Sequence, residues 1–134
     1  NINLLVGLAL PTGKLASTNL PQVLGKAQTT GTRGHGFISK AIGLRYSIDP
    51  TVARVTYDLG YKRLLGGGAF KYGPRPDVGV LFKNGNVKIF EVTSKTDIVS
   101  KLIGRNRLFM KTNKIPDNIY INNFAKYFNS YFPK

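Results

Sequence analysis

Three of the six acidic residues in this 134-residue chain lie within one stretch of the sequence, residues 73–97. These three are Asp77, Glu91 and Asp97, whereas the twenty lysines and arginines are distributed along the whole chain. In so basic a protein we expect the few acids to be scattered as partners for nearby cations. Carboxylates held close together instead suggest a metal site, because carboxylate oxygens are hard ligands that suit Mg²⁺.

The segment that carries Asp77 and Glu91 has the pattern of a β-hairpin with its turn near Asn84-Gly85. A two-residue turn would put the two acids on opposite faces, whereas a three-residue loop with Gly85 in the left-handed conformation would pair them. Both loops are common, so the sequence leaves the register open. We favour the second register, in which the Cβ atoms are about 5 Å apart and the like charges repel. A cation would then hold the pair, and Gly79 beside them would leave room for it.

The composition indicates the class of protein and the chemistry of its partner. A formal net charge of +14 predicts a polyanionic partner. The 42% hydrophobic and 11% aromatic content is typical of a single globular domain. The absence of cysteine excludes disulfides, thiolate chemistry and Cys-based zinc sites. No apolar run approaches the roughly 20 residues of a membrane span, so we expect no stable membrane insertion.

Periodicity and turn residues predict the elements that must position the hairpin. We expect a loosely packed lead-in over residues 1–32 and the folded domain over residues 33–134. The expected fold is α/β, a small mixed sheet with the antiparallel hairpin at its centre and helices on its faces. Residues 52–64 are compatible with a helix or a strand. The other expected elements are helices at 21–27, 37–46, 98–112 (with Asp97 as N-cap) and 124–132, and a strand at 118–121.

An Asp at the start of one strand, a Glu late in the next strand and a helix after it resemble the PD-(D/E)XK nuclease superfamily. The matching residues are Pro76-Asp77 and Glu91. The resemblance implies a restriction-endonuclease-like fold in which these two carboxylates hold a divalent metal and catalyse phosphodiester hydrolysis. Mg²⁺ is the expected metal, because it is bound through few carboxylates and keeps waters for the reaction.

The chain departs from the family pattern at the catalytic lysine. The family lysine lies two residues after the Glu, and this position is Thr93, which we keep as a candidate site residue. Lys95 is the nearest lysine and our provisional catalytic residue. Four residues of extended strand would carry it about 13 Å beyond Glu91, so it can serve only if the strand bends. Lys88 is the weaker alternative, because its parity places it on the face opposite to Glu91.

The longer pattern, Arg-Pro-Asp followed by Glu-Val-Thr-Ser-Lys-Thr-Asp at 91–97, is similar to toxin domains at the C-termini of bacterial polymorphic toxins. These include contact-dependent growth inhibition and Rhs-type proteins, and the resemblance covers about residues 33–111. It implies an endonuclease toxin that cleaves tRNA or DNA in the cytoplasm of competitor bacteria. It also implies secretion as the C-terminal part of a larger cell-surface protein, which the start without Met inside a Gly/Thr-rich lead-in fits. A cognate immunity protein, expected to be acidic, would neutralise the domain.

Further residues are candidates for the same site. Arg75, Lys71 and Arg105 are expected to contact substrate phosphates. Asp58 is a candidate third carboxylate, although a surface position is as plausible. His35, the single histidine, is a candidate general base, although we favour a role in a loop or a helix cap.

Two other classes of function compete with the nuclease. In a non-catalytic, basic nucleic-acid-binding module, the acids would be structural partners of surface lysines. A membrane-active toxin would use the Leu-rich N-terminus, which the globular pattern disfavours.

Overall fold

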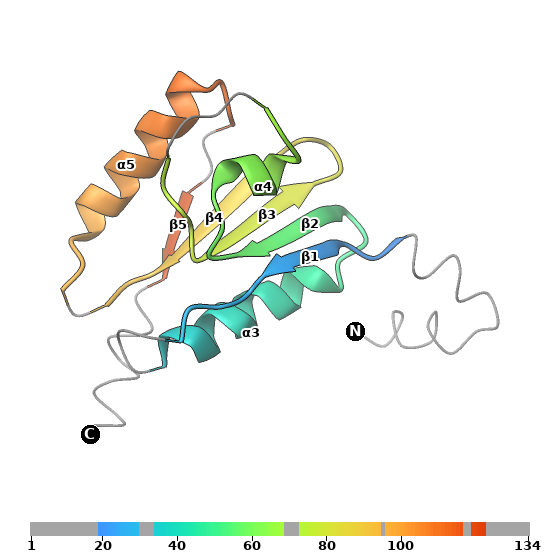
Figure 1. Ribbon diagram of the computed structural model, residues 1–134, viewed down its shortest axis with the longest axis horizontal. Helices are drawn as coiled ribbons and strands as arrows, with labels where there is room; N and C mark the ends of the chain where they lie inside the picture. The colour runs from blue at the N-terminus through green and yellow to red at the C-terminus, as the bar shows by residue number, and fades with distance from the viewer. Residues whose placement is uncertain (1–18, 30–33, 69–72, 95, 117–118, 123–134) are drawn as a thin grey trace.

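In the computed structural model, the described residues are 19–29, 34–68, 73–94, 96–116 and 119–122, and they form an α/β fold. Five strands make one mixed sheet in the order β1-β2-β3-β4-β5 (Figure 1). The two outer pairs, β1–β2 and β4–β5, are parallel, and the two inner pairs are antiparallel. The elements are β1 (Gln22–Gly25), α3 (His35–Ser47), β2 (Val52–Tyr57), α4 (Tyr61–Leu65), β3 (Val78–Phe82), β4 (Val87–Val92), α5 (Val99–Thr112) and β5 (Ile119–Asn122).

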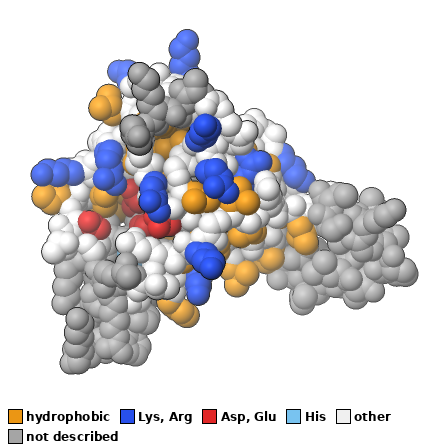
Figure 2. Space-filling view, viewed as in Figure 1, with side chains coloured by type: hydrophobic (Ala, Val, Ile, Leu, Met, Phe, Trp, Pro, Cys, Tyr) orange, Lys and Arg blue, Asp and Glu red, His pale blue; other side chains and the backbone are white. Residues whose placement is uncertain are grey.

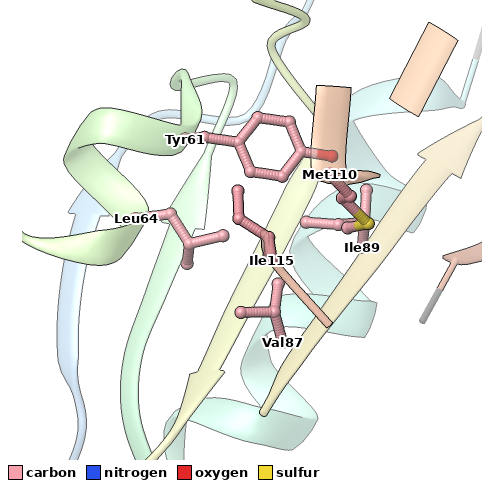
Figure 3. Close-up of a cluster of buried hydrophobic side chains, with 6 residues drawn as sticks. All are labelled: Tyr61, Leu64, Val87, Ile89, Met110 and Ile115. Atoms are coloured by element: carbon pink, nitrogen blue, oxygen red, sulfur yellow. The ribbon is translucent and has the colours of Figure 1, made fainter. Parts of the chain in front are cut away.

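The sheet is covered on both faces, with α4 and α5 on one side and α3 on the other (Figure 1). Alternate residues of β4 serve the two faces, as expected for a pleated strand. On the first face, side chains of α4, β4 and α5 meet in one buried cluster, which Figure 3 shows. On the second face, Tyr46 of α3 packs against Val52, Val55, Val78 and Val80. The expected α/β class, with helices on both faces, is therefore confirmed.

The hairpin has the three-residue loop that we favoured. Phe82 N donates a hydrogen bond to Asn86 O (2.8 Å), and Gly85 has a φ of 90°. Glycine adopts this left-handed conformation without steric cost. The ladder pairs Val80 with Lys88, and its continuation places Asp77 opposite Glu91. The register that brings the two acids together is thus confirmed.

Gly79 does not leave room beside the acids, contrary to our expectation. A Cβ atom on Gly79 would lie 2.6 Å from Thr56 Oγ1 and 2.9 Å from Leu64 Cδ2. The space is filled by β2 and α4, so the glycine serves the close packing of α4 on the sheet.

Several boundaries differ from those predicted. Residues 22–25 form a strand, not part of a helix, because parallel pairing with β2 overrides local preference. An edge strand therefore comes from within the expected lead-in. The ambiguous stretch 52–64 divides into strand β2 and the short helix α4. The helix expected at 37–46 and the strand expected at 118–121 correspond to α3 and β5, and the helix predicted at 124–132 lies outside the described residues.

Asp97 is not the N-cap of α5, because Ile98 occupies that position without a side-chain cap hydrogen bond. Asp97 Oδ2 instead accepts a hydrogen bond from Ser94 N (2.8 Å) in the turn before the helix. Among the described helices, none is long and apolar enough to cross a membrane.

Candidate active site

Asp77 and Glu91 meet at the end of the hairpin opposite to its turn. Asp77 N donates to Glu91 Oε1 (3.2 Å), and Val92 N donates to Asp77 Oδ2 (2.8 Å). The side chains of Asp77 and Glu91 are only 12% and 5% exposed. The hairpin backbone therefore fixes both carboxylates in a site that is largely shielded from water.

His35 belongs to this site, although it lies 42 residues before Asp77 in the sequence. It is the first residue of α3, and its Nε2 atom lies 3.2 Å from Asp77 Oδ2. The hydrogen bond to Asp77 raises the pKa of His35, although burial of the ring opposes this effect. His35 is therefore neither in a loop nor the helix cap that we favoured, because Gly34 is the N-cap of α3. When its ring is protonated, His35 provides a counter-ion for Asp77.

Asn106 holds Glu91 from the other side and is itself held by Tyr61, and neither residue was predicted to belong to the site. Asn106 Nδ2 donates to Glu91 Oε2 (3.0 Å), while Tyr61 Oη donates to Asn106 Oδ1 (2.6 Å). Both side chains are buried, so the network joins α4 and α5 to the hairpin beneath the surface. The available signal was a polar residue, Asn106, among the apolar positions of α5. Its partners could not be read from the sequence.

Burial and the neighbouring Asp77 both disfavour the ionised form of Glu91. Burial raises the pKa of Glu91, and the charge of Asp77 raises it further, against the hydrogen bond from Asn106. Arg105 also favours the ionised form, with its Nη2 atom 3.5 Å from Glu91 Oε2. A bound cation would therefore relieve the unfavourable proximity of the two negative charges.

Arg75 and Asp58 contact each other. Arg75 Nη2 lies 2.9 Å from Asp58 Oδ2, and the guanidinium also donates to Asp58 O. In the structure, Asp58 is therefore the ion-pair partner of an arginine. The Arg75 side chain, two residues before Asp77, remains 64% exposed. Lys71 and Lys95 lie outside the described residues.

Neither Thr93 nor Lys88 supplies the missing lysine charge at Glu91. Thr93 is fully buried. Lys88 lies on the α3 face of the sheet, where its Nζ atom is 5.4–5.7 Å from the ring centroids of Tyr46, Phe82 and Tyr120. The parity argument against Lys88 is therefore confirmed.

The donor set at this site fits Mg²⁺. The part of the chain that the structure describes contains no cluster of three or more His, Cys, Asp or Glu side chains suited to a metal. Mg²⁺ does not require such a cluster, because one or two carboxylates with waters and substrate phosphates are sufficient. Among the described residues, the partners of the Asp77 carboxylate contact Oδ2, so Oδ1 is the oxygen available to a metal.

The helices on the face of the sheet that carries Glu91 have exposed basic side chains. Figure 2 shows lysines and arginines around the acidic side chains that reach the surface there. The exposed cations of the two helices on this face are Lys62, Arg63, Lys101, Arg105, Arg107 and Lys111.

Comparison with models of known protein families, with curated protein sequences and with solved structures finds no match.

The metal-free protein is expected to lose stability as the pH rises above the ordinary pKa values of glutamate and histidine. The folded-state pKa values of Glu91 and His35 are both raised, so each group binds its proton more tightly in the folded protein. Their contributions are complete below the unfolded pKa values and are lost as the pH rises through the folded ones. In EDTA, the melting temperature of the wild type should therefore fall more steeply with rising pH than that of His35→Gln. A steeper decline for the variant would contradict the assignment.

Asn106→Leu is expected to destabilise the fold by about 1–3 kcal/mol, because the buried Tyr61 hydroxyl and Glu91 each lose a hydrogen bond to Asn106. It should also weaken metal binding about tenfold or more, as is usual when a residue that orients a ligand is lost. Denaturant melts and Mg²⁺ titrations measure the two effects. Tyr61→Phe, which keeps the ring and the Asn106 contact to Glu91, should lose less in both. Wild-type metal affinity in Asn106→Leu would refute this role.

Proposed function

We propose that this chain is a metal-dependent endonuclease domain in which Asp77 and Glu91 together hold Mg²⁺. The observation that carries the proposal is the pairing of the buried Glu91 and the partly buried Asp77 across the hairpin, each carboxylate fixed by a backbone hydrogen bond. A restriction-endonuclease-like architecture is part of the proposal. It is supported by the order strand, turn, strand, helix, with the hairpin inside a mixed sheet covered on both faces.

Bound Mg²⁺ would polarise the phosphoryl oxygen and lower the pKa of the attacking water. The chain's own residues prepare that chemistry. Asn106 keeps the Glu91 carboxylate oriented and favours its ionised form. Asp58 holds the exposed guanidinium of Arg75, which we assign to a substrate phosphate close to the site. Lys95 remains the proposed stabiliser of developing negative charge.

The basic surface supports a nucleic-acid substrate. Exposed lysines and arginines on α4 and α5 lie on the same face as the carboxylates. Such a field attracts a polyanion and positions its backbone without selecting a sequence. DNA and tRNA both remain within the proposal, since each offers the same phosphodiester group.

The toxin role is also a proposal and derives from the resemblance of residues 73–97. The domain would be delivered into the cytoplasm of a competitor bacterium from the C-terminal part of a larger cell-surface protein. An acidic immunity protein would neutralise it in the producing cell, and the net charge of +14 favours such a partner. Their association rate should then fall as the salt concentration rises, which stopped-flow mixing can measure.

One observation favours the alternative of a non-catalytic nucleic-acid-binding module. Each acid already has a cation of the chain beside it, His35 on Asp77 and Arg105 on Glu91. In that function the two acids and their two cations would only stabilise the fold. Removal of divalent metal with a chelator would leave nucleic-acid binding unchanged.

Incubation of the purified protein with plasmid DNA and with total RNA, in Mg²⁺ or in EDTA, separates the two functions. The nuclease proposal predicts cleavage of at least one substrate that EDTA abolishes. Binding of both substrates without cleavage in Mg²⁺ would support the alternative and overturn the proposal.

A further inference from the structure

The two cations of the site are held very differently. His35 is enclosed, with a side chain that is only 9% exposed. The Arg105 side chain is 56% exposed, and its 3.5 Å contact is the longest of the polar contacts to Glu91 among the described residues. Arg105 is therefore free to leave Glu91, whereas His35 is confined at Asp77.

Glu91 keeps other hydrogen bonds if Arg105 departs. Its Oε2 atom accepts the amide of the fully buried Asn106, and its Oε1 atom accepts the backbone N–H of Asp77. Loss of the Arg105 contact therefore leaves the orientation of the carboxylate unchanged. It removes one positive charge from the site.

A divalent cation and Arg105 would compete for the same carboxylate. Two ionised acids carry two negative charges, which protonated His35 and Arg105 balance. An added Mg²⁺ ion makes the site positive, which favours the departure of the exposed guanidinium. A guanidinium binds a phosphate through two parallel hydrogen bonds, so a nucleic-acid phosphate beside the metal offers it a new partner.

We propose that Arg105 is a displaceable counter-ion, which neutralises Glu91 in the metal-free protein and moves to a phosphate oxygen of the nucleic acid when the metal binds. The inference rests on the proposed nuclease function and adds a regulatory step to it. Metal and nucleic acid then favour each other's binding, because each offsets the cost of releasing Arg105, and this coupling is reciprocal.

Calorimetric titration of Mg²⁺ into the wild type, Arg105→Ala and Lys101→Ala at pH 8, without nucleic acid, tests the inference. Lys101→Ala removes an equal charge from an exposed position one turn earlier on α5 and makes a matched control. Arg105→Ala should bind Mg²⁺ about two- to fivefold more tightly than the wild type, because the exposed guanidinium, which is held only weakly, no longer competes for Glu91. Its kcat/KM for cleavage should nevertheless fall about tenfold or more, because a phosphate contact is lost. Lys101→Ala should leave the Mg²⁺ affinity unchanged.

The outcomes distinguish this inference from the function on which it rests. If Arg105→Ala binds Mg²⁺ equally or more weakly than the wild type, Arg105 orients Glu91 and is not displaced. If its cleavage is unimpaired, Arg105 does not contact the substrate. Either result overturns the inference and leaves the nuclease proposal intact. Failure of the wild type to bind Mg²⁺ at all would overturn both.

Discussion

Asp77→Asn and Glu91→Gln are each expected to lower the rate of phosphodiester cleavage by about 10³-fold or more, because several kcal/mol of metal-derived stabilisation would be lost. Both substitutions keep the size of the side chain, so the hairpin and its register should persist. Cleavage assays with saturating Mg²⁺ measure the effect, and circular dichroism checks the fold.

The stability of the same variants provides a second and opposite expectation. Glu91 is buried beside a like charge, which raises its pKa, so its ionised form is unfavourable without metal. Glu91→Gln should therefore melt in EDTA at pH 8 at the wild-type temperature or above it. Asp77→Asn keeps an oxygen for Val92 N and should retain the fold. Near wild-type cleavage by both variants would refute the site assignment.

Lys95→Ala is expected to lower turnover by a factor on the order of 10² or more, as when one group that stabilises developing charge is removed. The structure removes two alternatives to Lys95 for this role. Thr93, at the family position of the lysine, is buried and carries no charge. Lys88 is held among aromatic rings on the opposite face of the sheet.

Two control variants make the lysine experiment decisive. Lys88→Ala removes an equal charge from the other face and should leave turnover close to that of the wild type. Thr93→Ala should lower turnover less than Lys95→Ala. A silent Lys95→Ala combined with an inactive Lys88→Ala would show that our assignment of the lysine is wrong.

Local sequence predicted the hairpin and reduced its register to two alternatives, one for each common loop at Asn84-Gly85. The three-residue loop at Gly85 determines the hairpin register, and the register places Asp77 opposite Glu91. The charge repulsion between those acids correctly favoured this loop over the two-residue turn, although the cations beside them come from the chain itself. The apolar pattern at 37–46 likewise predicted most of α3.

The remaining parts of the site depend on contacts between distant segments. His35 reaches Asp77 only because α3 packs across β2 and β3, and Tyr61 meets Asn106 only because α4 and α5 share one face. Strand β1 forms only through parallel pairing with β2, which its own four residues cannot indicate. No local pattern encodes these distances, so a single histidine and a helical asparagine gave weak signals.

The central claim is that a metal-activated water attacks the phosphodiester bond. Mass spectrometry of oligonucleotide products formed in ¹⁸O-labelled water tests it most directly. The account predicts products only in the presence of Mg²⁺, with one ¹⁸O atom in each new terminal phosphate and no cyclic phosphate. Formation of 2′,3′-cyclic phosphate ends from RNA, at the same rate in EDTA as in Mg²⁺, would contradict it.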